Sequence, residues 1–492
     1  MTWLTKSGFL AGLQCEKRLW FDVHAPLEDG LSESTALLHG RAVDERVRRL
    51  IPGTVISCDQ GLPAAIAETA RLIRCGAPPV MHQPAFRAGD LAAVADVLET
   101  GAFGVTLTEV KASTGLRPEY LPDAAFQALV IRRAGCPVDR VLLKHVDRSF
   151  ELRTEGDYDG LLVDEDLTGE VEQCLPGVEE AVTRLRQVMA ATTCPATAMG
   201  EHCTVPRACP FIERCSAASG TCPDYPVTLL PRAGRTVQAL RAEGYGDLLQ
   251  VPAGRLAGRL HRRVHEATRT GQPYFDAAAT AGLRVLRYPL AYLDFETIGL
   301  AVPEFVGTHP YEQWPFQWSL HVEESAQTVR HAEFLALEQP GDLRPLATAL
   351  LEVVPDAGPV FAYNAAFERG VLERMAERLP ALAHALRDLA ARLVDLLPIV
   401  RAAYYHRDMK GSWSIKAVLP TIAPELDYAR LTEVREGDSA QRAFLEIWSG
   451  RPSARRGAQL REALLRYCER DTWGLVVLRR FLCGHAGRRP EA

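Results

Sequence analysis

The sequence predicts an α/β protein with more than one domain. The chain has 492 residues, and at ~150 residues per core it is long enough for about three cores. Hydrophobic residues make up 47% of it and charged residues 24%, an ordinary globular composition that excludes a disordered or fibrous chain. Stretches of alternating apolar residues interleave with amphipathic helical stretches, a pattern typical of α/β folds.

The net charge and the N-terminal segment restrict the functional class. The formal net charge of −6 provides no global basic field, so any site for a polyanion has to be local. The segment MTWLTKSGFLAGLQC lacks the pattern of a signal peptide, and no run of ~18 apolar residues occurs. We therefore expect a cytoplasmic protein with no membrane span. Its twelve cysteines are better candidates for metal ligands or core residues than for disulfides.

The pattern predicts an N-terminal domain over residues 1–225. Its expected elements are a helical region over 1–50, strands over 80–111, a helix over 122–133, a strand over 138–146, a helix that ends near 191 and a cysteine-rich segment over 194–222.

The rest of the chain divides into a connector, a second domain and a tail. Residues 226–285 have short helical patterns and no convincing strand, and within 231–270 eight arginines stand against three acids. This connector is either a solvated helical segment or a surface that contacts phosphates. Residues 286–485 predict a C-terminal α/β domain, and the tail 486–492 is expected to be disordered.

The first candidate site contains Asp96, Glu109 and Lys111. Glu109 and Lys111 are two residues apart on an expected strand, so they share a face, and Asp96 is expected at the end of the preceding strand. Two carboxylates beside an ammonium can hold a divalent cation and position a water for attack on phosphate. A surface ion pair is the simpler explanation of Glu-x-Lys.

The order of these residues resembles the RecB-type PD-(D/E)XK nucleases, in particular their CRISPR-associated exonuclease branch. The resemblance rests on Asp44 in a first helix, then Asp96, then Glu109-Val-Lys111, then Gln127 on a helix. It implies that Asp44, Asp96, Glu109 and the Val110 carbonyl bind Mg²⁺ or Mn²⁺. Asp44 stands where the family usually has a histidine, although aspartate is also a ligand for hard cations.

A second candidate site consists of cysteines. Cys203, Cys209 and Cys215 are separated by five residues each in GEHCTVPRACPFIERC, without the C-x-x-C pairs of a zinc ribbon, and Cys15 lies far upstream. Four thiolates can hold an iron–sulfur cluster. The set resembles the iron–sulfur branch of the same nucleases, which implies a [4Fe-4S] cluster; the family commonly has a shorter first gap, but an uncharacterised bacterial family shares the HC-x5-C-P-F-x3-C pattern. A zinc site or plain buried cysteines remain alternatives. The reserve ligands are Cys194, His202 and Cys222.

The third candidate site lies in the C-terminal half. Asp294 and Glu296 share a face of an expected strand, and Glu368 lies one turn into a helix. Tyr467 and Asp471 are four residues apart, hence on one helix face. Four carboxylates can hold two divalent ions about 4 Å apart, an arrangement that supports phosphodiester hydrolysis, and a tyrosine hydroxyl can orient the attacking water.

These motifs resemble the tyrosine-bearing DEDD exonucleases of the DnaQ-like, RNase H-fold clan. Glu368 occupies a position where the wider clan has aspartate. The segments GSWSIKAVLP and YCERDT are also features of the uncharacterised bacterial family. Lys416 is either a phosphate contact or a solvated lysine, and Asp395 is expected to be a helix cap or a structural acid.

Taken together, these resemblances imply a metal-dependent DNA nuclease with two potential active sites that acts on DNA ends or on single strands, with the C-terminal half as a 3′-to-5′ exonuclease. One alternative makes RNA the target of the C-terminal half, because nothing in the sequence decides which sugar is recognised. Another keeps both folds as nucleic-acid-binding modules, with one or both sites silent, within a repair or defence complex. The chain has no P-loop motif, and the sequence does not indicate its protein partners.

Overall fold

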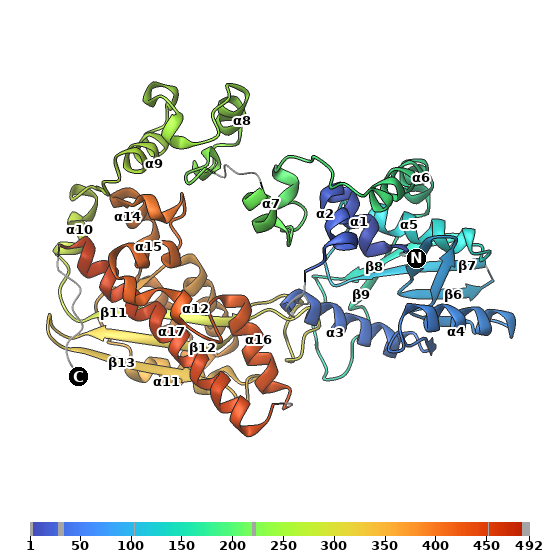
Figure 1. The fold of residues 1–492 in the computed structure, drawn as a ribbon. Helices are drawn as coiled ribbons and strands as arrows, with labels where there is room; N and C mark the ends of the chain where they lie inside the picture. Colours follow the sequence, from blue (N-terminus) through green and yellow to red (C-terminus); the bar gives the residue numbers. More distant parts are fainter. Residues whose placement is uncertain (1–2, 28–33, 103, 219–222, 451, 485–492) are drawn as a thin grey trace. The chain divides into compact units, whose positions relative to one another are not determined.

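The computed structural model describes residues 3–27, 34–102, 104–218, 223–450 and 452–484 (Figure 1). The tail 486–492 lies outside the described residues. The chain forms two compact units. Unit 1 comprises Met1–Thr221 and Leu300–Glu312, and unit 2 comprises Cys222–Gly299 and Gln313–Ala492. Each unit combines helices with mixed β-sheets, as the α/β prediction requires.

Unit 1 alternates between helices and strands along the chain. Its helices are α1 (Lys6–Gln14), α2 (Glu16–His24), α3 (Thr35–Leu50), α4 (Leu62–Arg74), α5 (Tyr120–Arg133), α6 (Thr168–Ala190) and α7 (Ile212–Ala218). Its strands are β1 (Leu4–Thr5), β2 (Thr54–Val55), β3 (Val80–His82), β4 (Ala85–Ala88), β5 (Leu91–Val94), β6 (Val97–Gly101), β7 (Gly104–Lys111), β8 (Arg140–Val146) and β9 (Leu162–Asp166).

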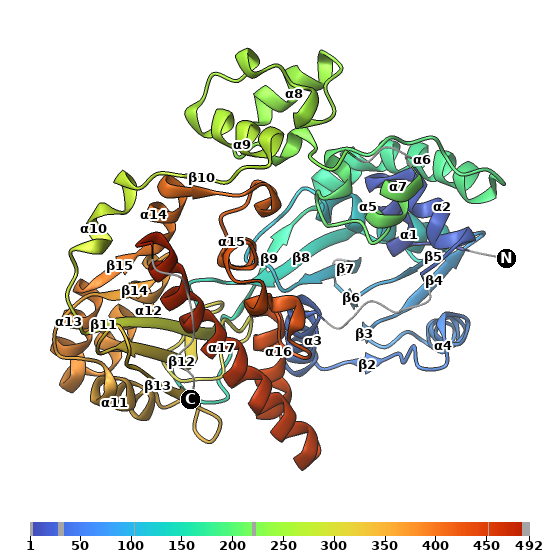
Figure 2. The same ribbon diagram turned by 60° about the vertical axis from the view of Figure 1, so that its left-hand side comes forward.

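Two sheets organise unit 1. The larger has the order β2-β3-β6-β7-β8-β9, with β7 parallel to β8 and antiparallel to β6. The smaller has the order β1-β5-β4. Helix α5 is buried along most of its length and packs against α1, α6, β4 and β5 (Figure 2). Phe126 of α5 stacks on Phe9 of α1 with ring centroids 4.6 Å apart, and because α5 is buried on all sides from Asp123 to Ile131, the helix expected here lies inside the core.

Unit 2 contains the remaining elements. Its helices are α8 (Gly234–Ala242), α9 (Arg259–Thr270), α10 (Ala281–Arg284), α11 (Leu343–Val353), α12 (Ala366–Arg378), α13 (Ala383–Ala391), α14 (Leu396–Ala403), α15 (Ile415–Ile422), α16 (Gly437–Trp448) and α17 (Ala454–Leu482). Its strands are β10 (Tyr274–Phe275), β11 (Leu290–Ile298), β12 (Trp314–Glu323), β13 (Val329–Leu335), β14 (Val360–Ala362), β15 (Leu393–Asp395) and β16 (Tyr404–Tyr405).

A five-stranded sheet and one long helix form the framework of unit 2. The sheet has the order β13-β12-β11-β14-β15; the first three strands are antiparallel, and β14 and β15 run parallel to β11. The 29-residue helix α17 packs along β11, β12 and β13 (Figures 1 and 2). Because α17 covers this face of the sheet, polar residues on the two elements meet in a buried layer.

Two local expectations need adjustment. The short pairing of β10 with β16 places a two-residue strand in 226–285, where none was expected. Residues 300–312, which lie within the range expected for the C-terminal domain, belong to unit 1. Ala301 and Val302 are buried there in one hydrophobic cluster with Val43 and Val146. Among the described helices, none is both long enough and apolar enough to cross a membrane.

Candidate functional sites

Unit 1 gathers acidic, lysine and amide side chains around β7. Lys111 Nζ donates to the Glu109 carboxylate and, at 2.8 Å, to Asp123 Oδ2. Lys6 of α1 reaches the same two carboxylates, at 3.1 Å from Glu109 Oε1 and 3.6 Å from Asp123 Oδ1. Gln127 Nε2 donates to Glu109 Oε2 at 2.6 Å and to Asp123 Oδ1 at 2.9 Å. Glu109 therefore lies at the centre of a dense polar network.

The other predicted residues of unit 1 line one cavity together with members of this network. The expectation that Asp96 ends a strand was wrong: it lies between β5 and β6, where the chain passes from the small sheet to the large one. Its Oδ2 accepts the Val110 N–H at 2.7 Å. Asp44 of α3, Asp96, Glu109, Val110 and Lys111 all line a cavity of about 610 Å³. The structure thus brings every predicted residue of this site together.

Burial and nearby charges shift the pKa values of Asp96 and Glu109 in opposite directions. Burial raises the pKa of Asp96 to about 8, and the Glu109 charge adds to the effect. Burial alone would also raise the pKa of Glu109, but the ammonium groups of Lys6 and Lys111 outweigh it and hold that pKa below its usual range. Burial likewise raises the pKa of Asp44. Near neutral pH, Glu109 is therefore the ionised member of the pair.

Sequence reasoning missed three residues of this site. Lys6 is one of only six lysines, and that scarcity was the available signal. Asp123 lies four residues before Gln127 on α5 and shares its helix face. Tyr311 lines the same cavity, its hydroxyl donates to the Ala112 carbonyl, and burial raises its pKa to about 12. Nothing in the local sequence links Tyr311 to a site almost 200 residues away.

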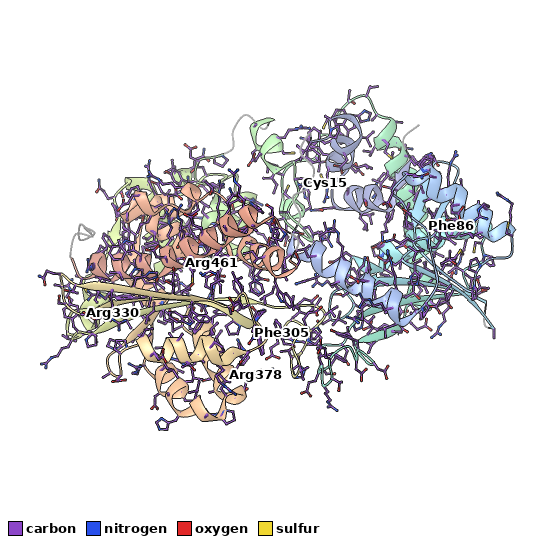
Figure 3. The ribbon with its side chains drawn as sticks, turned by 90° about the horizontal axis from the view of Figure 1, so that it is seen from below. Cys15, Phe86, Phe305, Arg330, Arg378 and Arg461 are labelled. Carbon is purple, nitrogen blue, oxygen red and sulfur yellow. The ribbon has the colours of Figure 1, made fainter. Side chains whose placement is uncertain are left out.

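The four candidate cluster cysteines border one small pocket. Cys15, at the junction of α1 and α2 (Figure 3), lines it together with Cys203, Cys209 and Cys215. Burial raises the thiol pKa of Cys209, and the charges of neighbouring cysteines add to it. His202 lines the pocket too, with Nε2 3.7 Å from Cys203 Sγ.

The reserve ligand Cys194 is not part of that lining; its thiol contacts the Pro195 carbonyl oxygen at 3.8 Å. Cys222 lies outside the described residues. Within the described ranges, the cysteines form no disulfide.

Unit 2 brings three of its four predicted acids into one group, and Glu368 lies near enough for its charge to raise the pKa values of Asp294 and Glu296. Asp294 and Glu296 lie on β11, Glu368 lies in the first turn of α12, and Asp471 lies on α17. Ligand oxygens of Asp294, Glu296 and Asp471 all lie within 4.8 Å of one another. Glu368 is 2% exposed, and its Oε2 is buried without a hydrogen-bond partner. We call these four residues the carboxylate cage.

The acids of the carboxylate cage repel one another. Burial raises the pKa of Asp294 well above its usual value, and the charges of Asp471, Glu296 and Glu368 add to the rise. Burial also raises the pKa of Glu296 and of Glu368 to about 8, and that of Asp471 to about 6. Each shift opposes ionisation, so a bound cation would relieve an electrostatic cost that the cage carries without one.

Three further side chains surround the cage. The Tyr428 hydroxyl donates to Asp471, a role that the sequence did not suggest. Lys416 Nζ lies 5.3 and 5.1 Å from the ring centroids of Tyr428 and Tyr467 and lowers the pKa of Glu296. Gly474 of α17 permits the close approach of α15, the helix that carries Lys416, because a Cβ at this position would collide with Leu419.

Asp395 is the N-cap of α14, which confirms the expectation that it is a helix cap. Its Oδ1 accepts the Leu397 N–H at 2.9 Å at the start of α14. The same oxygen accepts the Asn364 N–H at 2.9 Å. Asp395 therefore fixes the loop that precedes α12, and with it the position of Glu368.

Comparisons with known proteins match parts of this chain. Residues 291–414 match a family model described as a domain of unknown function (DUF2779). The chain is also 27% identical over 222 residues to a Mycoplasma pneumoniae protein named "Uncharacterized protein MG366 homolog", a match covering 40% of this chain and 32% of that protein. The match thus spans about a third of that relative's length. The family range includes Asp294, Glu296 and Glu368 and ends before Tyr467 and Asp471.

Proposed function

We propose that this protein is a metal-dependent nuclease and that unit 2 carries an exonuclease site of the DEDD type. The observation that carries the proposal is the carboxylate cage, because hard oxygen ligands favour Mg²⁺ or Mn²⁺. Two such ions in the cage would stabilise the attacking and leaving oxygens of a phosphodiester. The unpartnered Oε2 of Glu368 and the raised pKa values of the cage acids support this assignment.

The Tyr467 hydroxyl and the Lys416 ammonium group also have roles in this proposed site. Tyr467 lies on the same helix face as Asp471, and its hydroxyl would orient the attacking water. Lys416 supplies positive charge beside the cage, suited to a substrate phosphate. The mixed five-stranded sheet covered by α17 is compatible with an RNase H-like fold for unit 2.

Unit 1 is the second candidate nuclease site. Its support is the convergence of Asp96, Glu109 and Lys111 on one cavity, which agrees with a PD-(D/E)XK assignment. Asp44 and the Val110 carbonyl would complete the ligands of a Mg²⁺ or Mn²⁺ ion, and Lys111 would stabilise charge on the phosphate. A [4Fe-4S] cluster held by Cys15, Cys203, Cys209 and Cys215 would join the N-terminal helices to the segment 203–215.

The expected substrate is DNA with free ends or in single strands. RNA is the alternative for unit 2, since its acids act on the phosphate and not on the sugar. If neither site is active, the protein is a nucleic-acid-binding module of a repair or defence complex. The basic residues in 231–270 would offer a surface for a nucleic-acid strand, whether the protein cleaves that strand or only binds it.

One assay separates these possibilities. Protein purified without oxygen is incubated with Mn²⁺ and single-stranded DNA labelled at either end, with labelled RNA in parallel. Lys111→Ala and Asp294→Ala are compared with the wild type. We expect Asp294→Ala to lose removal of nucleotides from the 3′ end and Lys111→Ala to lose a different set of products. No cleavage of DNA or RNA by the wild type would contradict the nuclease proposal.

A further inference from the structure

Two histidines face each other on the sheet of unit 2, outside the carboxylate cage. His321 of β12 and His331 of β13 are direct cross-strand partners, and their rings stack with centroids 4.4 Å apart. Glu469 of α17 approaches from the helix that covers these strands. Ligand atoms of His321, His331 and Glu469 all lie within 4.8 Å of one another. Three separate elements thus converge on one point.

Hydroxyl groups hold both imidazole rings in place. His321 Nδ1 lies 2.9 Å from Thr472 Oγ1, and His331 Nε2 lies 2.9 Å from Ser319 Oγ. These two hydroxyls are themselves 2.7 Å apart. Histidines that bind metals usually use one ring nitrogen as the ligand while a polar partner orients the ring through the other. The hydroxyl pair provides that orientation for both rings.

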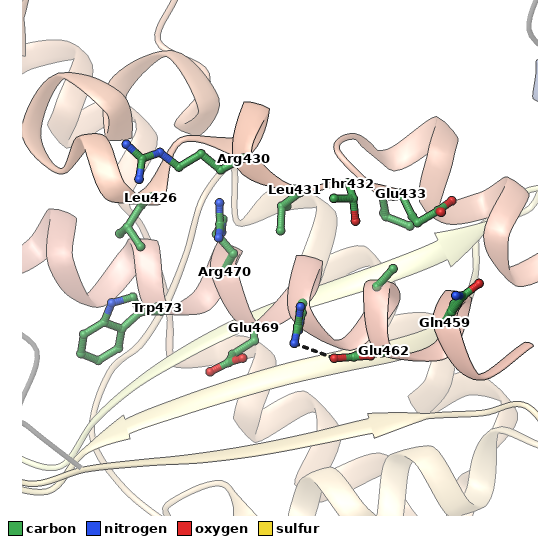
Figure 4. Close-up of a pocket in the computed structure, with 13 residues that line it drawn as sticks. Leu426, Arg430, Leu431, Thr432, Glu433, Gln459, Glu462, Glu469, Arg470 and Trp473 are labelled. Carbon is green, nitrogen blue, oxygen red and sulfur yellow. Dashed lines mark ion pairs between the residues drawn. The ribbon is translucent and has the colours of Figure 1, made fainter. Parts of the chain in front are cut away.

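Solvent and ions can reach this cluster. His331 is exposed, whereas His321 is buried and Glu469 lies between these extremes. Glu469 and Trp473 line a cavity of about 450 Å³, and Figure 4 shows both side chains projecting from the same helix. The Trp473 ring lies 5.4 Å from that of His321. An ion could therefore enter from the surface and retain a water ligand.

We propose that His321, His331 and Glu469 form a binding site for a divalent transition metal of the zinc type. The ligand set is two imidazoles and one carboxylate, with a further position open to water, a combination that zinc sites use. Imidazole ligands favour Zn²⁺ and Co²⁺ over Mg²⁺, whereas the carboxylate cage has oxygen ligands only. The site would tie β12 and β13 to α17, and it stands independently of nuclease activity.

Zinc binding to the full-length protein tests the proposal. Calorimetric titration with Zn²⁺ in excess Mg²⁺ compares the wild type with His331→Ala and Glu469→Gln. His384→Ala is the matched control, because that histidine is 91% exposed and pairs with Asp388 on α13. We expect each site variant to lose one equivalent of zinc or to bind it on the order of 100-fold more weakly. The control should bind zinc like the wild type.

Cobalt distinguishes this site from the cysteines. Co²⁺ bound by thiolates gives a strong charge-transfer absorption, whereas Co²⁺ bound by histidine and carboxylate gives only weak ligand-field bands. We expect His331→Ala to lose ligand-field intensity and to keep the thiolate band. Circular dichroism checks that the variants are folded; His331 is exposed, so its replacement leaves no cavity. Unchanged zinc stoichiometry and affinity in both site variants would overturn the proposal.

Discussion

The two candidate nuclease sites differ in how they balance negative charge. In unit 1, Lys6 and Lys111 contact Glu109 and Asp123 directly. In unit 2, the charges of Lys416 and Arg470 act on the carboxylate cage, but within the described ranges no ion pair joins either of them to a cage acid. Glu109 at the centre of the unit 1 network has a lowered pKa although the acids around it have raised ones, whereas all four acids of the cage have raised pKa values.

This difference indicates how each site depends on metal. Buried carboxylates need a compensating charge, and unit 1 supplies it from its own side chains. The carboxylate cage leaves that charge to a ligand. We therefore expect unit 1 to be stable without metal and unit 2 to gain most of the stabilisation that a divalent cation brings. Ligand oxygens of three cage acids lie within 4.8 Å of one another. This close spacing of like charges also favours a site in unit 2 that depends on a bound cation.

The largest expected effect is on catalysis in unit 2. Asp294→Asn should slow removal of nucleotides from a 3′ end on the order of 10³-fold, because the cage loses charge that holds metal against the phosphate. Digestion of end-labelled oligonucleotides measures it. The control Asp342→Asn alters only the N-cap of α11, where asparagine caps as well as aspartate. Trimming that survives in Asp294→Asn and disappears in Lys111→Ala would assign the activity to unit 1.

The next effect is the pH dependence of stability without metal. The pKa of Glu368 rises from its usual 4.5 to about 8 on folding. Between these values the folded state binds more protons than the unfolded state, so the free energy of unfolding falls as pH rises, by about 1.4 kcal/mol per pH unit for one fully responding group. Urea unfolding in a chelator from pH 5 to 8 measures the slope.

Glu368→Gln should make this slope shallower, because glutamine has no proton to release, while Glu296 and Asp294, whose pKa values are also raised, keep part of it. Glu425→Gln is the control, since that residue is exposed in the short 3-10 helix Pro424–Leu426. A slope that Glu368→Gln leaves unchanged would mean that Glu368 does not contribute to the pH dependence.

Manganese should stabilise the protein mainly through unit 2. At ~100 times its dissociation constant a ligand adds about 2.7 kcal/mol to the free energy of unfolding. We expect Glu368→Gln to lose most of this gain and Glu109→Gln to keep it, as measured by thermal unfolding with and without Mn²⁺. If Glu109→Gln is the variant that loses the gain, the proposed division between the units is reversed.

Removal of Lys6 should destabilise unit 1 even without metal. Lys6→Ala leaves the buried Glu109 and Asp123 with one contacting cation instead of two. Because the Lys6 side chain is 26% exposed, we expect a loss of about 2 kcal/mol, less than for a fully buried pair. Urea unfolding measures this loss. Arg71→Ala, which breaks an exposed pair with Glu68, should have little effect, and equal losses would refute the structural role of Lys6.

The smallest expected effect concerns Tyr428. Burial raises the pKa of Asp471 to about 6, and the hydrogen bond from Tyr428 opposes a further rise. Tyr428→Phe should therefore move the pH of half-maximal Mn²⁺ binding upward, by roughly one unit or less. Titrations of Mn²⁺ at several pH values measure it. An unchanged midpoint would show that the hydroxyl does not tune this acid.

Much of the unit 2 site follows from local pattern. Asp294 and Glu296 alternate on a strand, and Tyr467 and Asp471 are spaced by one helical turn, so each pair shares a face wherever its element lies. The unit 1 site was harder to predict from the sequence, because Asp96 lies in a link between two sheets and not at a strand end. Periodicity identifies a strand, but it does not say where the chain leaves one sheet for another.

The sequence alone determined which residue types share the face of a strand or helix, because that depends on periods of two and 3.6 residues. Together with the family resemblances, it was enough to select the cage acids, the four cysteines and Lys111 as candidates. Tertiary structure alone decided that Lys6 neutralises Glu109 and Asp123, that Tyr428 contacts Asp471, and that His321 and His331 meet Glu469. These contacts depend on sheet register and helix packing, which join residues that no local period relates.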